Sequence, residues 1–129
     1  MEVKSAAGMV NDAKVKVENL SVDQVAKEVG AGAILIDIRD AEERDHSGYI
    51  PGAVHASRGM LEFYADPALP YHKSEFDPER RIILHCASGG RSALAAVTLN
   101  EMGYPDVAYL DGGFNAWKEA GQPIEGGTA

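Results

Sequence analysis

Residues 81–92, R-I-I-L-H-C-A-S-G-G-R-S, carry the clearest signal of the fold. The first part of this stretch is an apolar run that ends at Cys86, which is typical of a strand buried on both faces of a parallel sheet. A tight, glycine-containing loop then breaks the run. Helical spacing of apolar residues resumes at Arg91 and continues to Met102, and Gly103 closes the helix. The stretch therefore predicts a strand, a tight loop and a helix in direct succession.

The rest of the chain repeats this alternation of strands and helices. Ser21 followed by Gln24 is a capping-box signature, which opens an amphipathic helix that ends at Gly30. A-I-L-I-D-I at residues 33–38 and V-A-Y-L at residues 107–110 predict two more strands. The remaining predicted elements are a short edge strand at V-K-V, residues 15–17, and a final short helix that carries Trp117. This alternation predicts a small three-layer α/β domain with a mainly parallel sheet.

The length of 129 residues predicts one compact domain, because a second domain would lack the residues for its own core. Residues 1–14 mix small and polar residues without periodicity, and we expect them to form a loose arm. The domain proper is expected to span residues 15–124, and residues 125–129 are expected to fray as a tail. Residues 64–80 hold three prolines and no clear period, which indicates a long surface excursion.

Composition narrows the classes of function. The net charge of -8 repels nucleic acid phosphates and anionic lipid, so we expect neither nucleic acid nor a membrane as a partner. No apolar run is long enough for a membrane span and the N-terminus lacks a signal-peptide core, which predicts a cytoplasmic protein. Cys86 is the only cysteine, so no intramolecular disulfide can form. The four histidines show no paired spacing, and we expect no metal.

The loop after the buried strand combines a thiol with the features of an anion site. Ligands bind at the carboxyl edge of parallel strands, where loop N–H groups and the start of the next helix favour negative charge. Cys86 lies at the base of this predicted cradle, which stabilises its thiolate, and Arg91 supplies a cation at the rim. No Asp or Glu occurs from Arg80 through Asn100. The remaining residues of the predicted binding loop are Ala87, Ser88, Gly89, Gly90 and Ser92.

Several of these side chains can be explained by a structural role as well as by a catalytic one. Most single cysteines are small buried hydrophobic residues, but the loop around Cys86 favours a nucleophile. Asp37 and Arg39 end a predicted strand, where we expect an ion pair that braces the neighbouring loop rather than a catalytic pair. His85 is expected to pack in the sheet, because consecutive strand residues point to opposite faces. The charges at residues 42–45 are expected to form a solvated helix start.

Four short motifs occur here in the same order as in the rhodanese family. Cys86, Gly89 and Arg91 match the family's loop, in which cysteine, two variable residues, glycine, one variable residue and arginine follow one another. The other motifs are D-I-R at residues 37–39 with Glu42 following, I-P-G-A at residues 50–53 and L-D-G-G-F-N-A-W at residues 110–117. The chain resembles the family from about residue 17 to residue 124. The chain differs from the family at one position. Single-domain members usually have histidine before I-P-G-A, whereas this chain has Tyr49, and we interpret the position as structural.

The resemblance implies a rhodanese-like domain with a central five-stranded sheet and helices on both faces. It implies a thiosulfate sulfurtransferase, in which Cys86 takes a sulfane sulfur from a small anionic donor and passes it, as a persulfide, to cyanide or to a thiol, including a protein thiol. It implies no metal or organic cofactor. Arg58 lies where the family's neighbouring loop approaches the active site, so it is a candidate for donor binding, with a surface salt bridge as the equal alternative.

Two other functions stay open. Cysteine phosphatases and arsenate reductases use a thiolate in a similar cradle, but they place five residues between cysteine and arginine. Four residues separate Cys86 from Arg91, and Ser92 stands where the phosphatase arginine would fall. The shorter loop favours a sulfur atom over a phosphoryl group. The other is a persulfide carrier or a module that only binds a partner protein. The intact Cys86 argues against an inert binding module, whereas a carrier would need the same residues as the enzyme.

Overall fold

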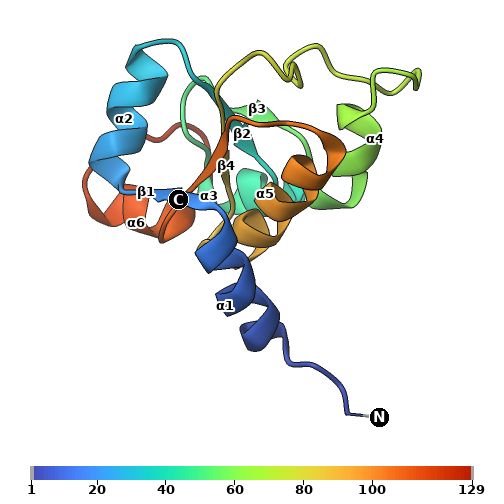
Figure 1. Cartoon of the computed structure of the whole chain (residues 1–129). Helices are drawn as coiled ribbons and strands as arrows, with labels where there is room; N and C mark the ends of the chain where they lie inside the picture. Colours follow the sequence, from blue (N-terminus) through green and yellow to red (C-terminus); the bar gives the residue numbers. More distant parts are fainter. Residues whose placement is uncertain (1, 129) are drawn as a thin grey trace.

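The computed structural model describes residues 2–128 and shows one five-stranded parallel sheet between two layers of helices (Figure 1). The strand order is β1-β5-β4-β2-β3, and each neighbouring pair is parallel. This confirms the predicted α/β fold class. The strands are β1 (Glu18–Leu20), β2 (Ile34–Asp37), β3 (Val54–His55), β4 (Ile82–His85) and β5 (Val107–Leu110). The helices are α1 (Ala6–Lys16), α2 (Val22–Gly30), α3 (Ala41–Ser47), the 3-10 turn η1 (Arg58–Met60), α4 (Leu61–Ala65), α5 (Gly90–Met102) and α6 (Gly113–Glu119).

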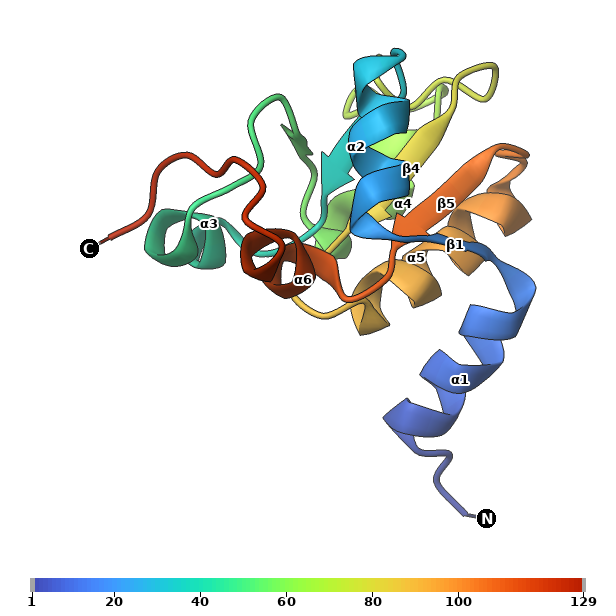
Figure 2. The same ribbon diagram turned by 90° about the vertical axis from the view of Figure 1, so that its left-hand side faces the viewer.

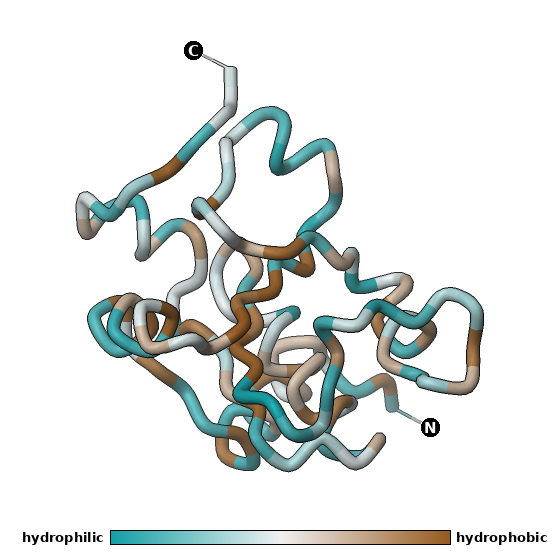
Figure 3. The backbone as a smooth tube through the Cα atoms, turned by 90° about the horizontal axis from the view of Figure 1, so that it is seen from above, coloured by the Kyte–Doolittle hydropathy of each residue, from teal (hydrophilic) through white to brown (hydrophobic). Residues whose placement is uncertain are grey.

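Alternate residues of the central strands face opposite helix layers. Ile36, Ile82 and Leu84 pack in the core under α4 and α5, whereas Leu35 and Ile83 pack in the core under α2 and α6. Figure 2 shows the two layers on either side of the sheet, and Figure 3 shows the apolar strands in the middle of the polar loops. Burial on both faces explains why these strands appear in the sequence as continuous apolar runs. It also places β4, and the loop that follows it, in the centre of the molecule.

The expectation of a loose N-terminal arm is wrong. Ser5 caps a regular helix, α1, by accepting a hydrogen bond from the Gly8 N–H at 3.0 Å, and Ala13 and Val17 are buried in the core beside α5. The predicted edge strand at residues 15–17 is also wrong, because most of it belongs to the end of α1 and the strand begins at Glu18. No helical period of apolar residues is visible here, because only one narrow side of α1 is buried. Met1, the first residue of the predicted arm, lies outside the described residues.

The expectation of a frayed C-terminal tail is wrong for residues 125–128. Glu125 and Tyr49 exchange two backbone hydrogen bonds of 2.8 and 2.9 Å, and the Thr128 N–H donates to the His46 carbonyl oxygen at 3.0 Å. The tail therefore lies along the end of α3, as Figure 2 shows. These contacts use backbone atoms, which explains why a glycine-rich sequence gave no sign of them. Ala129 lies outside the described residues.

The surface excursion at residues 64–80 is anchored to the core by one tyrosine. The Tyr104 hydroxyl hydrogen-bonds the carbonyl oxygens of Ala65 and Phe76 at 2.7 and 3.0 Å. The Phe76 ring is buried and meets the Tyr104 ring edge to face, with ring centroids 6.4 Å apart. The excursion begins at the end of α4 and has no further helix or strand, so these contacts hold an irregular segment at two points. Among residues 2–128, no helix is long and apolar enough to cross a membrane.

We predict that Tyr104→Phe lowers the free energy of unfolding by about 1–3 kcal/mol, because the Ala65 carbonyl oxygen loses its hydroxyl donor and the Phe76 carbonyl oxygen keeps only His72 Nε2, at 3.0 Å. Urea unfolding measures the change. Tyr71→Phe is the matched control in the same excursion, since Tyr71 is 57% exposed, and should change the free energy by less than about 0.5 kcal/mol. Equal effects of the two substitutions would show that Tyr104 does not anchor the segment.

Candidate active site

The candidate site lies where the central strands end. Asp37 and His85 are register partners at the ends of β2 and β4, and the Ile38 N–H donates to the His85 carbonyl oxygen at 3.0 Å. Cys86 follows β4 directly and therefore emerges in the middle of the carboxyl edge of the sheet. This is the edge at which open α/β sheets bind their ligands.

The loop after β4 turns a backbone N–H toward the cysteine sulfur. Gly89 has a left-handed φ of 108°, and its N–H donates to Cys86 Sγ at 3.2 Å. Ser92 Oγ lies 3.4 Å from the same sulfur and donates to the Gly89 carbonyl oxygen at 3.2 Å. Cys86 is only 1% exposed, as a core residue would be, yet its sulfur has polar neighbours. Ala87, Gly90 and Ser88 complete the loop, and Ser88 is exposed.

The start of α6 holds this loop from behind. The N–H groups of Phe114 and Asn115 donate to the carbonyl oxygens of Cys86 and Ala87 at 2.8 and 3.0 Å. Gly113 makes this approach possible, because a Cβ at that position would lie 2.6 Å from the Cys86 carbonyl oxygen. With both carbonyl oxygens bonded on the outside, the loop is fixed in the conformation that points the Gly89 N–H inward. Gly113 of the D-G-G motif thus helps to position the cysteine.

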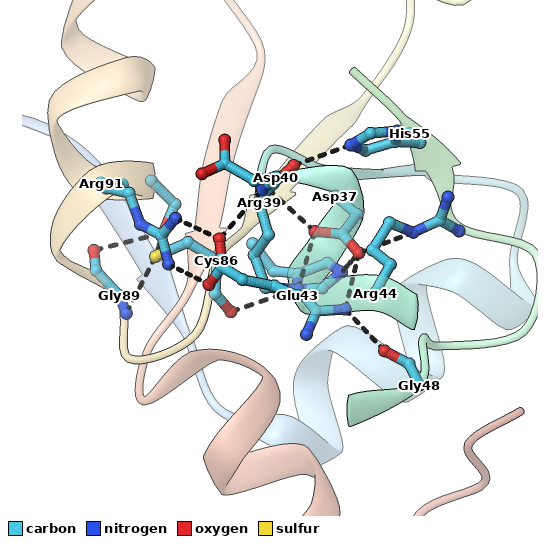
Figure 4. A network of polar contacts seen from close by, with 12 residues as sticks. Asp37, Arg39, Asp40, Glu43, Arg44, Gly48, His55, Cys86, Gly89 and Arg91 are labelled. Atoms are coloured by element: carbon cyan, nitrogen blue, oxygen red, sulfur yellow. Dashed lines mark hydrogen bonds and ion pairs between the residues drawn. The ribbon is translucent and has the colours of Figure 1, made fainter. Parts of the chain in front are cut away.

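Arg91 is paired with a carboxylate instead of standing alone at the rim. Its guanidinium donates to both oxygens of Glu43 at 2.8 and 2.9 Å, and the pKa of Glu43 is lowered to about 2, chiefly by these hydrogen bonds (Figure 4). This corrects the expectation of a solvated helix start for Glu43, whereas Glu42 and Asp45 are exposed as expected. The acid-free run around Cys86 did not reveal Glu43, because the carboxylate comes from α3. The available signal was D-A-E-E at residues 40–43, a capping box that the structure contains.

A buried charge cluster lies beneath the site (Figure 4). Arg39 donates to both oxygens of Asp37 at 3.0 and 2.9 Å and to the Gly48 carbonyl oxygen at 2.8 Å, so the expected strand-end ion pair is present. Arg44 Nε lies 3.2 Å from Asp37 Oδ2. Burial opposes ionisation of Asp37, but the hydrogen bonds from Arg39 and the nearby positive charge lower its pKa on balance. The cluster joins β2 to the end of α3.

His85 and Tyr49 have the structural positions that the sequence indicates. His85 is buried, its ring is stacked on Phe114, and burial lowers its pKa, so it is neutral at pH 7. Its Nδ1 lies 3.3 Å from the Cys86 carbonyl oxygen and its Nε2 lies 3.7 Å from Asp37 Oδ2. The Arg44 guanidinium lies over the Tyr49 ring, with its Cζ 4.7 Å from the ring centroid.

Arg58 lies away from the loop. Its guanidinium pairs with Glu62 at 2.9 Å and lies 3.5 Å from the Thr98 hydroxyl, which is almost two helical turns beyond Arg91 on α5. It lines a cavity of about 310 Å³ between α1 and α5. The structure therefore supports the salt-bridge alternative for Arg58. Within residues 2–128, no group of three or more metal-binding side chains occurs.

Comparison with known proteins identifies the family. The model of the rhodanese-like domain matches residues 21–120. The chain belongs to the rhodanese-like family. A relative in Shewanella oneidensis, the thiosulfate sulfurtransferase GlpE, is 35% identical over 104 residues, which are 80% of this chain and 94% of the relative. A sulfurtransferase of Allochromatium vinosum is 34% identical over 91 residues, 70% of this chain and 77% of the relative.

Solved structures carry the same domain. A protein of unknown function from Rhodopseudomonas palustris, described as a possible tyrosine phosphatase, is 40% identical, covers 97% of both chains and has a TM-score of 0.90. The polysulfide-sulfur transferase homodimer of Wolinella succinogenes is 32% identical, covers 92% of this chain and 85% of that one, and has a TM-score of 0.74. The rhodanese-like fold therefore extends over almost the whole chain, including the helix α1 that lies before the family match.

We predict that Gly113→Ala destabilises this rhodanese-like domain by about 3 kcal/mol, because the new Cβ combines backbone strain with a clash against the Cys86 carbonyl oxygen. Gly121→Ala is the matched control, since Gly121 also has a positive φ, of 76°, but no atom near its Cβ position. It should cost only about 1 kcal/mol. Urea unfolding compares the two variants, and equal losses would mean that the close approach of α6 to the loop is unimportant.

We predict that Asp37→Asn destabilises the protein by about 3–5 kcal/mol at pH 7, because it leaves Arg39 buried without its carboxylate. The pKa of Asp37 in the folded protein is below the ordinary 3.8. The stabilisation is therefore fully present above pH 3.8 and is lost as the pH falls through the lower folded value. The gap between wild type and variant should narrow in that acid range.

Urea unfolding at pH 7, 5 and 3 measures this gap. Asp45→Asn, the same change at an exposed position of α3, is the control and should have little effect at any of the three pH values. A gap for Asp37→Asn that does not change with pH would contradict the role of the ionised carboxylate.

Proposed function

We propose that this protein is a sulfurtransferase that carries a sulfane sulfur on Cys86 as a persulfide. One observation carries the proposal: the sulfur of Cys86 lies in a closed backbone loop and accepts the Gly89 N–H at 3.2 Å, directly before the 13-residue helix α5. Such a loop stabilises negative charge on the sulfur and on any atom bonded to it. A thiolate is the reactive form of cysteine, so the loop activates the residue that it surrounds.

The first half of the reaction loads Cys86. Its thiolate attacks the outer sulfur of a small anionic donor such as thiosulfate, the donor's sulfur–sulfur bond breaks, and the electron pair leaves with sulfite. The product is a persulfide on Cys86, whose outer sulfur carries the negative charge. The Gly89 N–H, which points at the cysteine sulfur, and the start of α5 support stabilisation of that charge, and no metal is needed for this step.

The second half returns the enzyme to its starting state. Cyanide or a thiolate attacks the outer sulfur of the persulfide, and the bond between the two sulfurs breaks with its electron pair on Cys86. The products are thiocyanate or a new persulfide, together with the regenerated thiolate. Because Cys86 is 1% exposed, an acceptor reaches the outer sulfur more readily than the cysteine itself.

The names of the relatives support sulfur transfer. The relatives from Shewanella oneidensis and Allochromatium vinosum are named as sulfurtransferases, and the former spans 94% of its own length in the match. The name of the Shewanella oneidensis relative also favours thiosulfate as the donor for this chain. The Wolinella succinogenes structure is described as a polysulfide-sulfur transferase, which makes polysulfide a second donor to assay.

Phosphatase activity is the second candidate, because the Rhodopseudomonas palustris structure is described as a possible tyrosine phosphatase. Two features of this chain disfavour it. Four residues between Cys86 and Arg91 close a smaller ring of N–H groups than a phosphoryl group with three oxygens requires. In addition, the Arg91 guanidinium, which would hold phosphate oxygens, is bound by Glu43.

We predict that Cys86→Ser abolishes sulfur transfer from thiosulfate to cyanide, because a hydroxyl cannot form the persulfide. Thiocyanate formation measures activity, and an aryl phosphate is assayed beside it. Wild-type protein incubated with thiosulfate should gain one sulfur by mass spectrometry, and the Ser variant none. Release of phosphate without thiocyanate, or an equal mass gain in the variant, would overturn the proposal. Circular dichroism of the variant provides the control for folding.

A further inference from the structure

The mouth of the site holds a cation and an anion that are fixed to each other. Arg91 from α5 and Glu43 from α3 are 40% and 33% exposed and form a bidentate pair. The Asp40 N–H donates to the same carboxylate at 2.9 Å, so Glu43 is held from two sides. The carboxylate is ionised throughout the neutral and mildly acid range, since its pKa is about 2.

This pairing changes the charge that a donor meets. Arg91 stands five residues after Cys86, in the first turn of α5, and Figure 4 shows its guanidinium next to the cysteine, so it belongs to the electrostatic surroundings of the reacting sulfur. Glu43 cancels the charge of Arg91 at a contact distance of 2.8 Å. A donor anion that approaches Cys86 therefore meets an ion pair of zero net charge rather than a free cation.

We infer that Glu43 determines which donors the site prefers according to their charge. By neutralising Arg91, it lowers the affinity of the site for dianions. The inference rests on the proposed function, whose donor must reach Cys86 past this pair. Electrostatic energy scales with the charge of the ligand, so one unit of charge at the mouth shifts the binding free energy of a dianion twice as far as that of a monoanion. The fold-change for a dianion is then the square of that for a monoanion.

Glu43→Gln tests the inference, because glutamine removes the charge at nearly the same size and keeps one oxygen that can accept from Arg91. Glu42→Gln is the matched control, since Glu42 is its exposed neighbour on α3 and the change in net charge is the same. Glu43→Asp keeps the charge and changes only the length. It should retain the wild-type preference between donors, which a role in packing alone would not predict.

The first readout compares two donors that react in the same way. Cys86 attacks the outer sulfur of thiosulfate, a dianion that releases sulfite, or of methanethiosulfonate, a monoanion that releases methanesulfinate. In Glu43→Gln, KM for thiosulfate should fall about tenfold and KM for methanethiosulfonate about threefold, with kcat changed less than KM. Glu42→Gln should shift either KM less than about twofold. Equal shifts for both donors, or equal shifts in the two variants, would overturn the inference.

The second readout does not need sulfur transfer. Cys86 is the only cysteine, so its alkylation by neutral iodoacetamide reports directly on the site. The concentration of sulfate that halves the alkylation rate should fall about tenfold in Glu43→Gln, and that of nitrate about threefold. If wild-type protein forms no thiocyanate, the proposed function fails, and this measurement alone decides the inference. No difference between the Gln variant and wild type, or no protection by sulfate in either, would overturn it.

Discussion

Two backbone hydrogen bonds from the start of α6 to the carbonyl oxygens of Cys86 and Ala87 fix the loop on which the site depends. A loop of this kind has free N–H and C=O groups on both sides, and burial requires each of them to be bonded. The N–H groups of α6 bond the two carbonyl oxygens on the outer side of the loop. In the loop conformation that they fix, the Gly89 N–H points inward and donates to the cysteine sulfur. Gly113 is required because no other residue has room beside the Cys86 carbonyl oxygen. The site is therefore built mainly from backbone groups, and side chains only adjust it.

Ion pairs attach α3 to this frame. Asp37 joins the end of β2 to Arg39 and Arg44, and Arg39 also bonds the carbonyl oxygen of Gly48, at the end of α3. Glu43 joins the same helix to Arg91 on α5. Since α3 has only seven residues and none of them is buried, these charges hold it in place. Helix α3 thus brings the carboxylate of Glu43 to the site, although α3 itself buries no residue against the sheet.

Particular residues show how far the sequence predicts the molecule. The buried strands at β2, β4 and β5, the capped helix α2 and the cysteine loop follow from local patterns, because burial on both faces and capping leave a direct mark on composition. Helix α1 and the bonded tail did not follow, since α1 buries only Ala13 and the tail uses backbone atoms. Glu43 was missed for a related reason. Its partner Arg91 lies 48 residues further along the chain, and no local pattern joins the two.

Local patterns in the chain predict the parallel α/β architecture and the glycine-rich loop after the single cysteine, because each depends on residues that are neighbours in the sequence. The folded structure alone shows which groups surround that cysteine. It placed Glu43 on Arg91, paired Arg58 with Glu62 and away from the loop, and brought Gly113 against the Cys86 carbonyl oxygen. The physical reason is that electrostatic and close-packing contacts depend on distance in space, and the chain joins distant segments only when the sheet forms.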